Sequence, residues 1–175
     1  MDACPHGGRS LTIRVGSVPG GGQADGLGVI YELGGKGRRM SPDEAGEFVA
    51  SNHRAVLITR RPGGGLQTSP VLVGVDDEGE VVISTREGAY KTRNLRRDPT
   101  VVLCVLSDDF FGRWIQIEGT AQIVSLPEAM EGLVDYYRRI SGEHPDWDDY
   151  RRAMQHEQRV LVRVSIDAAG PVHAR

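Results

Sequence analysis

A short cationic run is the segment of this sequence whose residue types and spacing best suit a chemical task. The run is KTRNLRR at 91–97; it follows an expected strand at 81–85, and an Asp-Pro pair ends it. A strand that leads into a helix presents backbone N–H groups without partners, and the helix dipole favours a phosphate there. Lys91 lies in the first turn, where its ammonium adds a full charge. Arg96 and Arg97 are equally typical of a solvated helix end, so the pattern predicts a phosphate site at Lys91 with a solvent-exposed cationic helix as the alternative.

Other kinds of catalytic or metal site have little support in the sequence. The two cysteines, Cys4 and Cys104, form no CxxC pair, so neither a disulfide framework nor a cysteine-based zinc site is predicted. Cys104 is expected to be a small buried residue within the apolar run 101–106. The histidines show no ligand spacing, and no serine or cysteine lies in a recognisable nucleophile motif. We therefore predict no metal site and leave the catalytic residues unassigned.

Composition limits the classes of partner. The 175 residues, of which 39% are hydrophobic, suffice for one domain with a core of ordinary size. A net charge of -3 and a pI near 6.0 disfavour nucleic acid as a partner. No apolar run is long enough to span a bilayer, and the N-terminus shows no signal-peptide pattern. We therefore expect a cytoplasmic protein.

The first 39 residues differ from the rest of the chain. They contain 11 of the 23 glycines and few large apolar residues, so they bury little surface. We interpret residues 1–39 as a flexible N-terminal extension and residues 40–175 as the folded domain. A second interpretation takes Met40 as the natural start.

From Ser41 onward, regular elements alternate with turns. Ser41, Pro42 and Glu44 combine an N-cap, a proline at the first helical position and a capping-box acid, which predicts a helix to about Ser51. The cationic run is predicted to form a second, short helix. Strands are predicted at 54–60, 66–75, 80–85, 100–107, 114–123 and 159–166, and later helices at 127–140 and 148–156.

These elements predict a six-stranded antiparallel β-barrel of α+β type with flanking helices. The first three strands are joined by tight turns, which predicts a meander and disfavours parallel crossovers there. Strict alternation over 114–123 places Ile115, Ile117, Ala121 and Ile123 on one face. The unbroken apolar run predicts that strand 100–107 is buried.

Three segments together resemble one known family. They are KTRNLRRDP at 91–99, IEGTAQ at 117–122 and YYRRISGEHPDWDDYR at 136–151. In this order they are similar to the pyridoxamine 5′-phosphate oxidase-like split-barrel proteins, and more narrowly to the actinobacterial members that bind the deazaflavin coenzyme F420. The resemblance covers about residues 40–171. It implies a homodimer with a flavin-like cofactor in a groove at the subunit interface.

The resemblance also assigns cofactor-binding residues. Lys91 corresponds to the phosphate-binding lysine of the family, and the strand-end residues Ser84 and Thr85 contact the same group. The segment that lines the ring contains Gln67, Ser69, Pro70 and Val71. Trp114 stands where relatives often have an aromatic residue that reaches the partner's cofactor.

One departure from the family pattern concerns the phosphate. Some relatives have an arginine two residues before the lysine, where this chain has Ala89. Either Arg86 substitutes for it or phosphate binding is weaker. A further set of arginines is expected to attract the oligoglutamate tail of F420, or else to be simply solvated: Arg60, Arg61, Arg86, Arg93 and Arg97.

The implied function is an F420-dependent oxidoreductase. Reduced F420 donates a hydride to a small organic acceptor, such as a quinone, an enone, a nitroaromatic or a tetrapyrrole like biliverdin, while the protein orients the reactants. An FMN-dependent oxidase or reductase of the pyridoxamine phosphate oxidase type remains an alternative, because FMN presents the same phosphate and a similar ring. A non-catalytic F420 carrier and a heme-binding split barrel are further alternatives. The sequence does not name the electron acceptor.

Overall fold

Capping residues and β-branched runs determine where the elements of this chain begin and end. The computed structural model describes residues 39–109 and 112–170, all of which belong to one unit, Lys36–Arg175. The predicted extension lies outside the described residues, except for Arg39. The first helix, α1 (Pro42–Ser51), has the predicted capping box: Ser41 Oγ accepts a hydrogen bond from the Glu44 N–H, and the Glu44 carboxylate accepts one from the Ser41 N–H.

The remaining elements follow the predicted order. The other helices are α2 (Tyr90–Arg97), α3 (Met130–Ser141) and α4 (Trp147–His156). The strands are β1 (Arg54–Arg60), β2 (Leu66–Leu72), β3 (Gly74–Val75), β4 (Val81–Arg86), β5 (Thr100–Leu106), β6 (Trp114–Val124) and β7 (Arg159–Ala169). Among the residues that the structure describes, no helix is long and apolar enough to cross a membrane.

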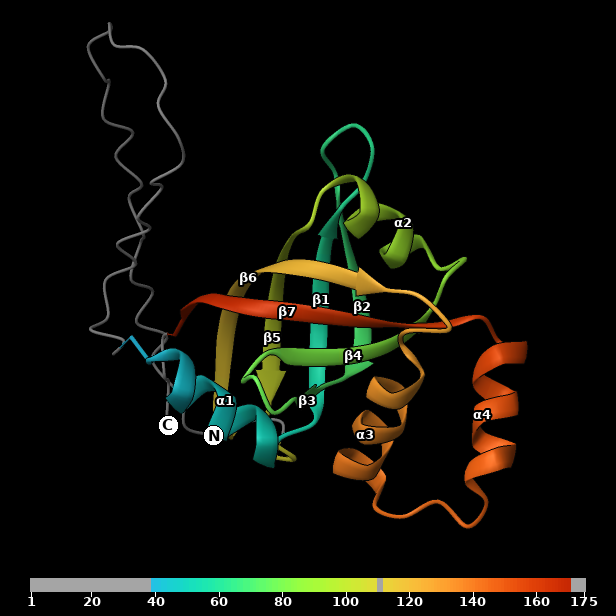
Figure 1. Cartoon of the computed structure of the whole chain (residues 1–175). Helices are drawn as coiled ribbons and strands as arrows, with labels where there is room; N and C mark the ends of the chain where they lie inside the picture. The colour runs from blue at the N-terminus through green and yellow to red at the C-terminus, as the bar shows by residue number, and fades with distance from the viewer. Residues whose placement is uncertain (1–38, 110–111, 171–175) are drawn as a thin grey trace, which may run out of the picture. The chain divides into compact units, whose positions relative to one another are not determined.

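All strand pairs of the sheet are antiparallel, in the order β2-β1-β5-β6-β7-β4-β3. The sheet curls into a half-barrel, with α1 near one end, α3 and α4 side by side at another, and α2 beside the upper parts of β1 and β2 (Figure 1). This arrangement confirms the α+β antiparallel class.

The predicted strand count is wrong, because the sheet contains seven strands rather than six. The predicted strand at 66–75 is interrupted at Val73, whose N–H donates to the His53 carbonyl at 2.8 Å. Residues before Val73 pair with β1, whereas Gly74 and Val75 pair with β4 at the far edge of the sheet. The predicted meander is therefore also wrong: β4 pairs with β7 and β3, and a gap separates it from β2.

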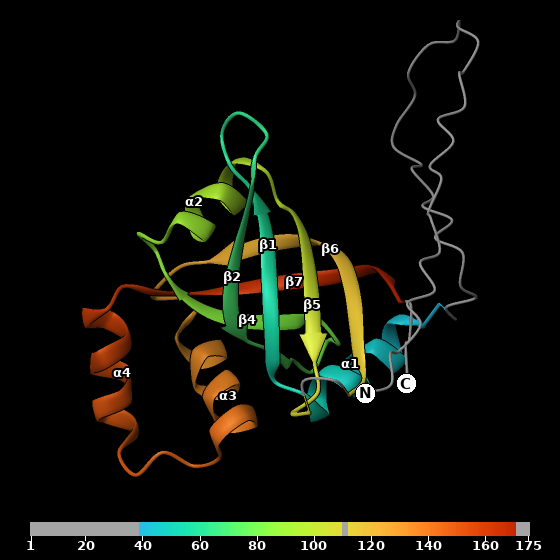
Figure 2. The same cartoon turned by 180° about the vertical axis from the view of Figure 1, so that it is seen from behind.

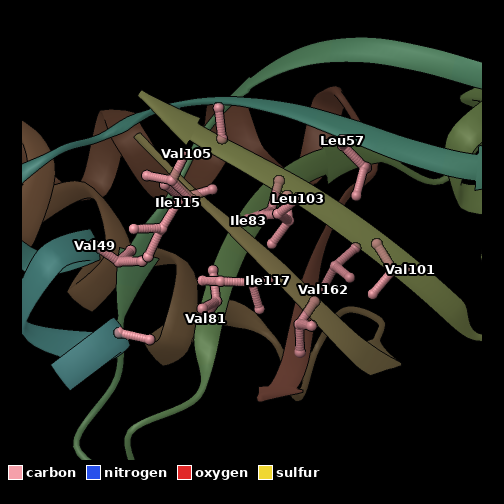
Figure 3. Packing of buried hydrophobic residues seen from close by; sticks show 14 of the residues in the cluster. Val49, Leu57, Val81, Ile83, Val101, Leu103, Val105, Ile115, Ile117 and Val162 are labelled. Carbon is pink, nitrogen blue, oxygen red and sulfur yellow. The ribbon is translucent and has the colours of Figure 1, made fainter. Parts of the chain in front are cut away.

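Two apolar clusters hold these elements together. The larger one fills the curl of the sheet and is covered at one end by Ala45, Phe48 and Val49 of α1. Figure 3 shows its strand side chains converging from several strands, among them Leu103 and Ile117. The smaller cluster packs α3 and α4 against β4 and β7. Its fully buried member Leu133 lies on α3.

The alternation predicted for β6 is confirmed. Ile115, Ile117 and Ala121 are buried, and Ile123 packs against the same cluster. The expectation that β5 is wholly buried is wrong, because only alternate residues of β5 face the core.

The outer face of β2, β1 and β5 carries no helix in the described part of the chain (Figure 2). Cys104 lies on this face and is half-buried, which corrects the expectation of a buried cysteine. Partial burial raises the pKa of its thiol. Two half-buried valines are its neighbours on this face. Val56 of β1 lies directly opposite Cys104, and Val102 of β5 lies opposite Ile58.

Candidate functional site

A cavity of about 660 Å³ lies where the gap between β2 and β4 meets the start of α2 and the helices α3 and α4. Its strand walls come from the end of β2, the end of β4 and the first residue of β7. Its lining residues are Pro70, Val71, Leu72, Ser84, Thr85, Arg86, Ala89, Lys91, Tyr136, Tyr137, Ile140, Ser141, Tyr150, Met154 and Arg159. The cavity thus has one cationic end and one aromatic and apolar wall.

Buried polar residues hold α2 in place beside this cavity. Thr92 is fully buried, and its hydroxyl donates to the Arg86 carbonyl at 2.7 Å, which ties the helix to the end of β4. Leu95, one turn later, packs into the core. Ala89 at the N-cap supplies no capping side chain. The start of α2 is therefore fixed in position while its first amides are left without a side-chain cap.

Lys91 lines the cavity and has an unusual electrostatic environment. Burial lowers the pKa of its ammonium, and the nearby positive charge of Arg159 lowers it further. No acidic side chain among the described residues lies within ion-pairing distance of Lys91. A partly desolvated cation without a counter-ion suits an external anion.

Two arginines add to the charge at the same end. Arg86 and Arg159 both line the cavity and are direct register partners across β4 and β7. Both donate to Glu157, the residue that caps the C-terminus of α4. Hydrogen bonds from Arg159 and then from Arg86 lower the pKa of the Glu157 carboxyl, so it is ionised at neutral pH. With Lys91 included, the four groups carry a net charge of two positive units.

Tyrosines with engaged hydroxyls also line the cavity, close enough to the cations for the charge of Arg159 to act on Tyr136 and Tyr150. The Tyr136 hydroxyl donates to the Leu72 carbonyl at 3.0 Å, which links α3 to the exposed edge of β2, and burial raises the pKa of Tyr136. The Tyr150 hydroxyl donates to the Leu133 carbonyl at 2.9 Å. Burial and then the neighbouring Tyr136 raise the pKa of Tyr150 to about 12.

Tyr150 belongs to an aromatic cluster. The rings of Tyr137, Tyr150, His144 and Trp147 lie with centroids 5.1–5.9 Å apart, mostly in edge-on or tilted arrangements. Such pairs stabilise packing beyond their buried area. Through His144, the cluster packs the loop between α3 and α4 against Tyr137 and Tyr150.

Comparison with known proteins places this cavity in a family context. Residues 41–173 match the family model described as pyridoxamine 5′-phosphate oxidase. The chain belongs to the pyridoxamine 5′-phosphate oxidase family. A conserved hypothetical protein from Mycobacterium tuberculosis is 30% identical, with a TM-score of 0.61 over 74% of this chain and 82% of that one.

More distant members of known structure share the fold. A protein described as an F420 reductase is 20% identical, with a TM-score of 0.56 over 71% of this chain and 94% of its own. A heme storage protein from Vibrio cholerae is 16% identical, with a TM-score of 0.59 over 78% and 97%. At these identities the likeness concerns the pyridoxamine 5′-phosphate oxidase fold alone.

Most residues that the sequence assigned to a cofactor meet in this one cavity of the pyridoxamine 5′-phosphate oxidase domain. They come from three elements, β2, β4 and α2: Pro70, Val71, Ser84, Thr85, Arg86 and Lys91. Thr85 is buried, and Ser84 is half-buried at the end of β4.

The other assigned residues do not line this cavity. Gln67 Oε1 accepts a hydrogen bond from Asn94 at 2.8 Å, and Ser69 lies opposite Leu57 in the β1–β2 pair. The Arg93 guanidinium lies over the Tyr90 ring at 4.5 Å. Trp114 starts β6 on the uncovered outer face, opposite Leu106.

Sequence reasoning missed several lining residues of this family member. Arg159 is the most consequential, and the tyrosines of α3 and Tyr150 of α4 were read only as packing or as part of a family motif. The signal for Arg159 was its position at the first residue of the last strand, which becomes informative only once β7 is known to pair with β4.

A second cavity, of about 740 Å³, lies beside α1 and suits an anionic cofactor less well. Glu44 and Glu47 line it, against the single cation Arg113. Among the described residues, no group of three or more histidine, cysteine or acidic side chains is arranged to hold a metal ion.

Proposed function

We propose that this protein binds the deazaflavin F420 in the cavity between β2, β4 and α3, and uses its reduced form to reduce a small organic acceptor. The observation that carries the proposal is the convergence of Arg86, Lys91 and Arg159 in a 660 Å³ cavity that is also lined by tyrosines. A phosphate-bearing ring cofactor combines an anionic end with a flat apolar body.

The residues present fit this cofactor. Lys91 and the start of α2 are suited to the phosphate, because the ammonium is partly desolvated and no described carboxylate neutralises it. The end of β2, with Pro70 and Val71, is suited to the ring. Ser84 adds a hydroxyl next to the phosphate position, from the end of β4.

When bound, reduced F420 supplies a hydride from the carbon that replaces N5 of a flavin. The protein binds and orients the reactants and keeps water away from the cavity wall. The hydroxyls of Tyr136 and Tyr150 are engaged in hydrogen bonds to backbone carbonyls, so we assign neither of them a proton-transfer role. The proposed acceptors are quinones, enones, nitroaromatics and tetrapyrroles.

F420 is preferred over FMN because of exposed arginines outside the cavity. Arg61 and Arg93 are exposed, and no described carboxylate pairs with either of them, so they are available to the oligoglutamate tail of F420. Arg60 and Arg97 are less available, since Arg97 donates to the Arg60 carbonyl and Arg60 lies 3.8 Å from Asp98. A protein described as an F420 reductase has the same fold.

We also propose that the protein is a homodimer that shares the cofactor site across the outer face of β1, β2 and β5. No helix of the described residues covers that face, and Leu66 and Leu72 are 58% and 48% exposed. Apolar side chains left in water favour association. Trp114 lies at the start of β6 on the same side of the sheet, and we propose that it reaches the partner's cofactor.

Titration with F420 and with FMN tests the cofactor assignment. F420 fluorescence should change on binding, with a lower Kd than for FMN. Lys91→Ala should weaken binding by about 1.5–3 kcal/mol, the value of a charge-assisted contact. The matched control is Arg152→Ala, which removes a positive charge paired with Asp149 on the exposed side of α4. Tighter binding of FMN would reassign the cofactor, and equal affinities in the two variants would remove the phosphate role of Lys91.

A separate experiment decides between an enzyme and a carrier. Reduced F420 is mixed anaerobically with one acceptor of each proposed class, and its reoxidation is followed by the return of deazaflavin fluorescence. Turnover of any acceptor at a rate above the protein-free reaction supports the oxidoreductase. Tight binding with no acceleration for any class would make the protein a carrier.

A further inference from the structure

Two arginines face each other at the cationic end of the cavity. Arg86 ends β4 and Arg159 begins β7, and the two are direct partners in the antiparallel register. Like charges directly opposite each other on neighbouring strands repel. Lys91 brings a third positive charge close enough for Arg159 to lower its pKa. The free protein therefore needs a compensating negative charge at this position.

Glu157 supplies that charge through one oxygen. Its Oε2 accepts hydrogen bonds from Arg86 Nε and Nη2 at 3.2 and 3.0 Å and from Arg159 Nε at 2.9 Å, and it lies 2.8 Å from Arg159 Nη2 in an ion pair. A carboxylate oxygen has lone pairs for about two strong hydrogen bonds. The single Oε2 atom therefore cannot bind all four guanidinium nitrogens strongly. A phosphate group offers more oxygens and more charge to the same two guanidiniums.

The backbone holds Glu157 beside Arg159 at some cost. Gln158, between them, has a φ of 49°, in the left-handed region that residues other than glycine rarely adopt. Two hydrogen bonds fix it there: its N–H donates to the Gln155 carbonyl at 3.1 Å, and its carbonyl accepts from the Glu87 N–H at 2.9 Å. This turn directs the side chains on both sides of Gln158 to the same place.

We propose that Glu157 is a built-in competitor of the cofactor phosphate: its carboxylate holds Arg86 and Arg159 in the free protein, and the phosphate takes both guanidiniums over on binding. The proposal rests on the phosphate position given under the proposed function. It also adds Arg159 to the residues that contact the phosphate. Because displacing a carboxylate requires a stronger anion, the device selects phosphate over singly charged carboxylates.

Affinity measurements with paired ligands test the competition. FMN and riboflavin differ by the phosphate alone, so their ratio of Kd values isolates it. Glu157→Gln should tighten FMN binding by about tenfold, the equivalent of one charge-assisted hydrogen bond, and leave riboflavin unchanged. Arg159→Gln should weaken FMN binding by a similar factor. The control Glu131→Gln removes a carboxylate paired with Arg151 at 3.2 Å, away from the cavity, and should change neither Kd.

Two results would overturn the proposal. If Glu157→Gln weakens FMN binding and spares riboflavin, the carboxylate positions the arginines for the phosphate instead of competing with it. If Glu157→Gln leaves both Kd values unchanged, the carboxylate is not exchanged at all. In the double variant with Arg159→Gln the gain from Glu157→Gln should shrink, and an undiminished gain would show that it does not act through Arg159.

Inorganic phosphate separates this inference from the cofactor assignment. Thermal unfolding in increasing phosphate should show a rise in Tm that is larger for Glu157→Gln than for the natural chain and smaller for Arg159→Gln. If phosphate follows this order but neither F420 nor FMN binds, the proposed function fails and the competition stands. The opposite outcome is that F420 or FMN binds with equal affinity to the natural chain, Glu157→Gln and Arg159→Gln, and that phosphate raises the Tm of all three equally. The competition then fails and the proposed function stands.

Discussion

Asn94 donates a hydrogen bond from Nδ2 to Gln67 Oε1 at 2.8 Å, and a second one to Thr59 Oγ1 at 3.1 Å. Both Asn94 and Thr59 are buried. The Asn94 amide thereby joins α2 to β1 and β2 at once. Gln67, which the family resemblance assigned to the ring, contributes by fixing the helix that carries Lys91.

Replacing this amide should loosen the helix. Asn94→Ala removes both hydrogen bonds and leaves a buried space, so we expect the free energy of unfolding to fall by about 1–3 kcal/mol. FMN affinity should fall as well, because α2 positions Lys91. Arg93→Ala, on the exposed side of the same helix, should change stability by less than about 0.5 kcal/mol. Urea unfolding compares the variants, and equal midpoints for both would show that the amide contacts do not stabilise α2.

The lowered pKa of Lys91 predicts an alkaline limit to phosphate binding. Above its pKa the side chain is neutral and no longer attracts the phosphate, and this pKa lies below the ordinary value of 10.5. FMN affinity relative to riboflavin should therefore be constant at neutral pH and fall before the pH reaches 10.5. Lys91→Arg keeps its charge and should abolish the fall. A parallel decline in the arginine variant would assign the effect to another group.

Local signals were sufficient for most elements of the fold. The capping box from Ser41 to Glu44 and the alternation of β6 each depend on residues close together in the sequence, and both are confirmed. The step from β4 into α2 also depends on neighbouring residues, so the sequence predicted it together with the candidate residue Lys91.

The features that the sequence did not reveal depend on how strands pair that are far apart in the sequence. The change of partner at Val73 is decided by which strands flank β2 and β3, and no local pattern records it. Arg159 becomes part of the site only because β7 pairs with β4. Cys104 is half-exposed because no described helix covers its face, which its apolar neighbours in the sequence did not indicate.

Gly119 is required by a close backbone contact. It lies at an irregularity of the β6–β7 register, where a Cβ would approach the Ser165 carbonyl oxygen to 2.1 Å. Because backbone atoms cannot move aside as a side chain can, Gly119→Ala should lower the free energy of unfolding by about 1–3 kcal/mol or more. Gly88→Ala is the matched control, since nothing lies within 4 Å of its Cβ position. Equal Tm values for both variants would contradict this account of the glycine in the family motif.

A charge on the uncovered sheet face should disrupt the proposed dimer. Val102 is half-buried in the middle of that face, next to Ile58 in the register. Val102→Glu places a carboxylate in the interface, where desolvation disfavours it. We expect sedimentation to show monomers and cofactor affinity to fall. Gln155→Glu adds the same charge on exposed α4 and should leave the dimer intact. A monomeric natural chain that still binds the cofactor would contradict the shared site.

The buried hydroxyl of Tyr150 predicts a specific loss of stability in alkali. Burial raises its pKa from 10.0 to about 12, so the folded state favours the neutral phenol. Stability from this group is complete below pH 10 and is lost as the pH rises toward 12, by about 3 kcal/mol at most. Tyr150→Phe loses the hydrogen bond to the Leu133 carbonyl, which costs about 1 kcal/mol at neutral pH, but it has no phenol to ionise.

The stability difference between the natural chain and this variant, measured by urea unfolding, should therefore shrink above pH 10 and then reverse. Tyr90→Phe, where the tyrosine is 71% exposed, should show no such reversal. A difference for Tyr150→Phe that stays constant with pH would mean that water reaches the phenol in the folded protein and that the tyrosine wall of the cavity opens.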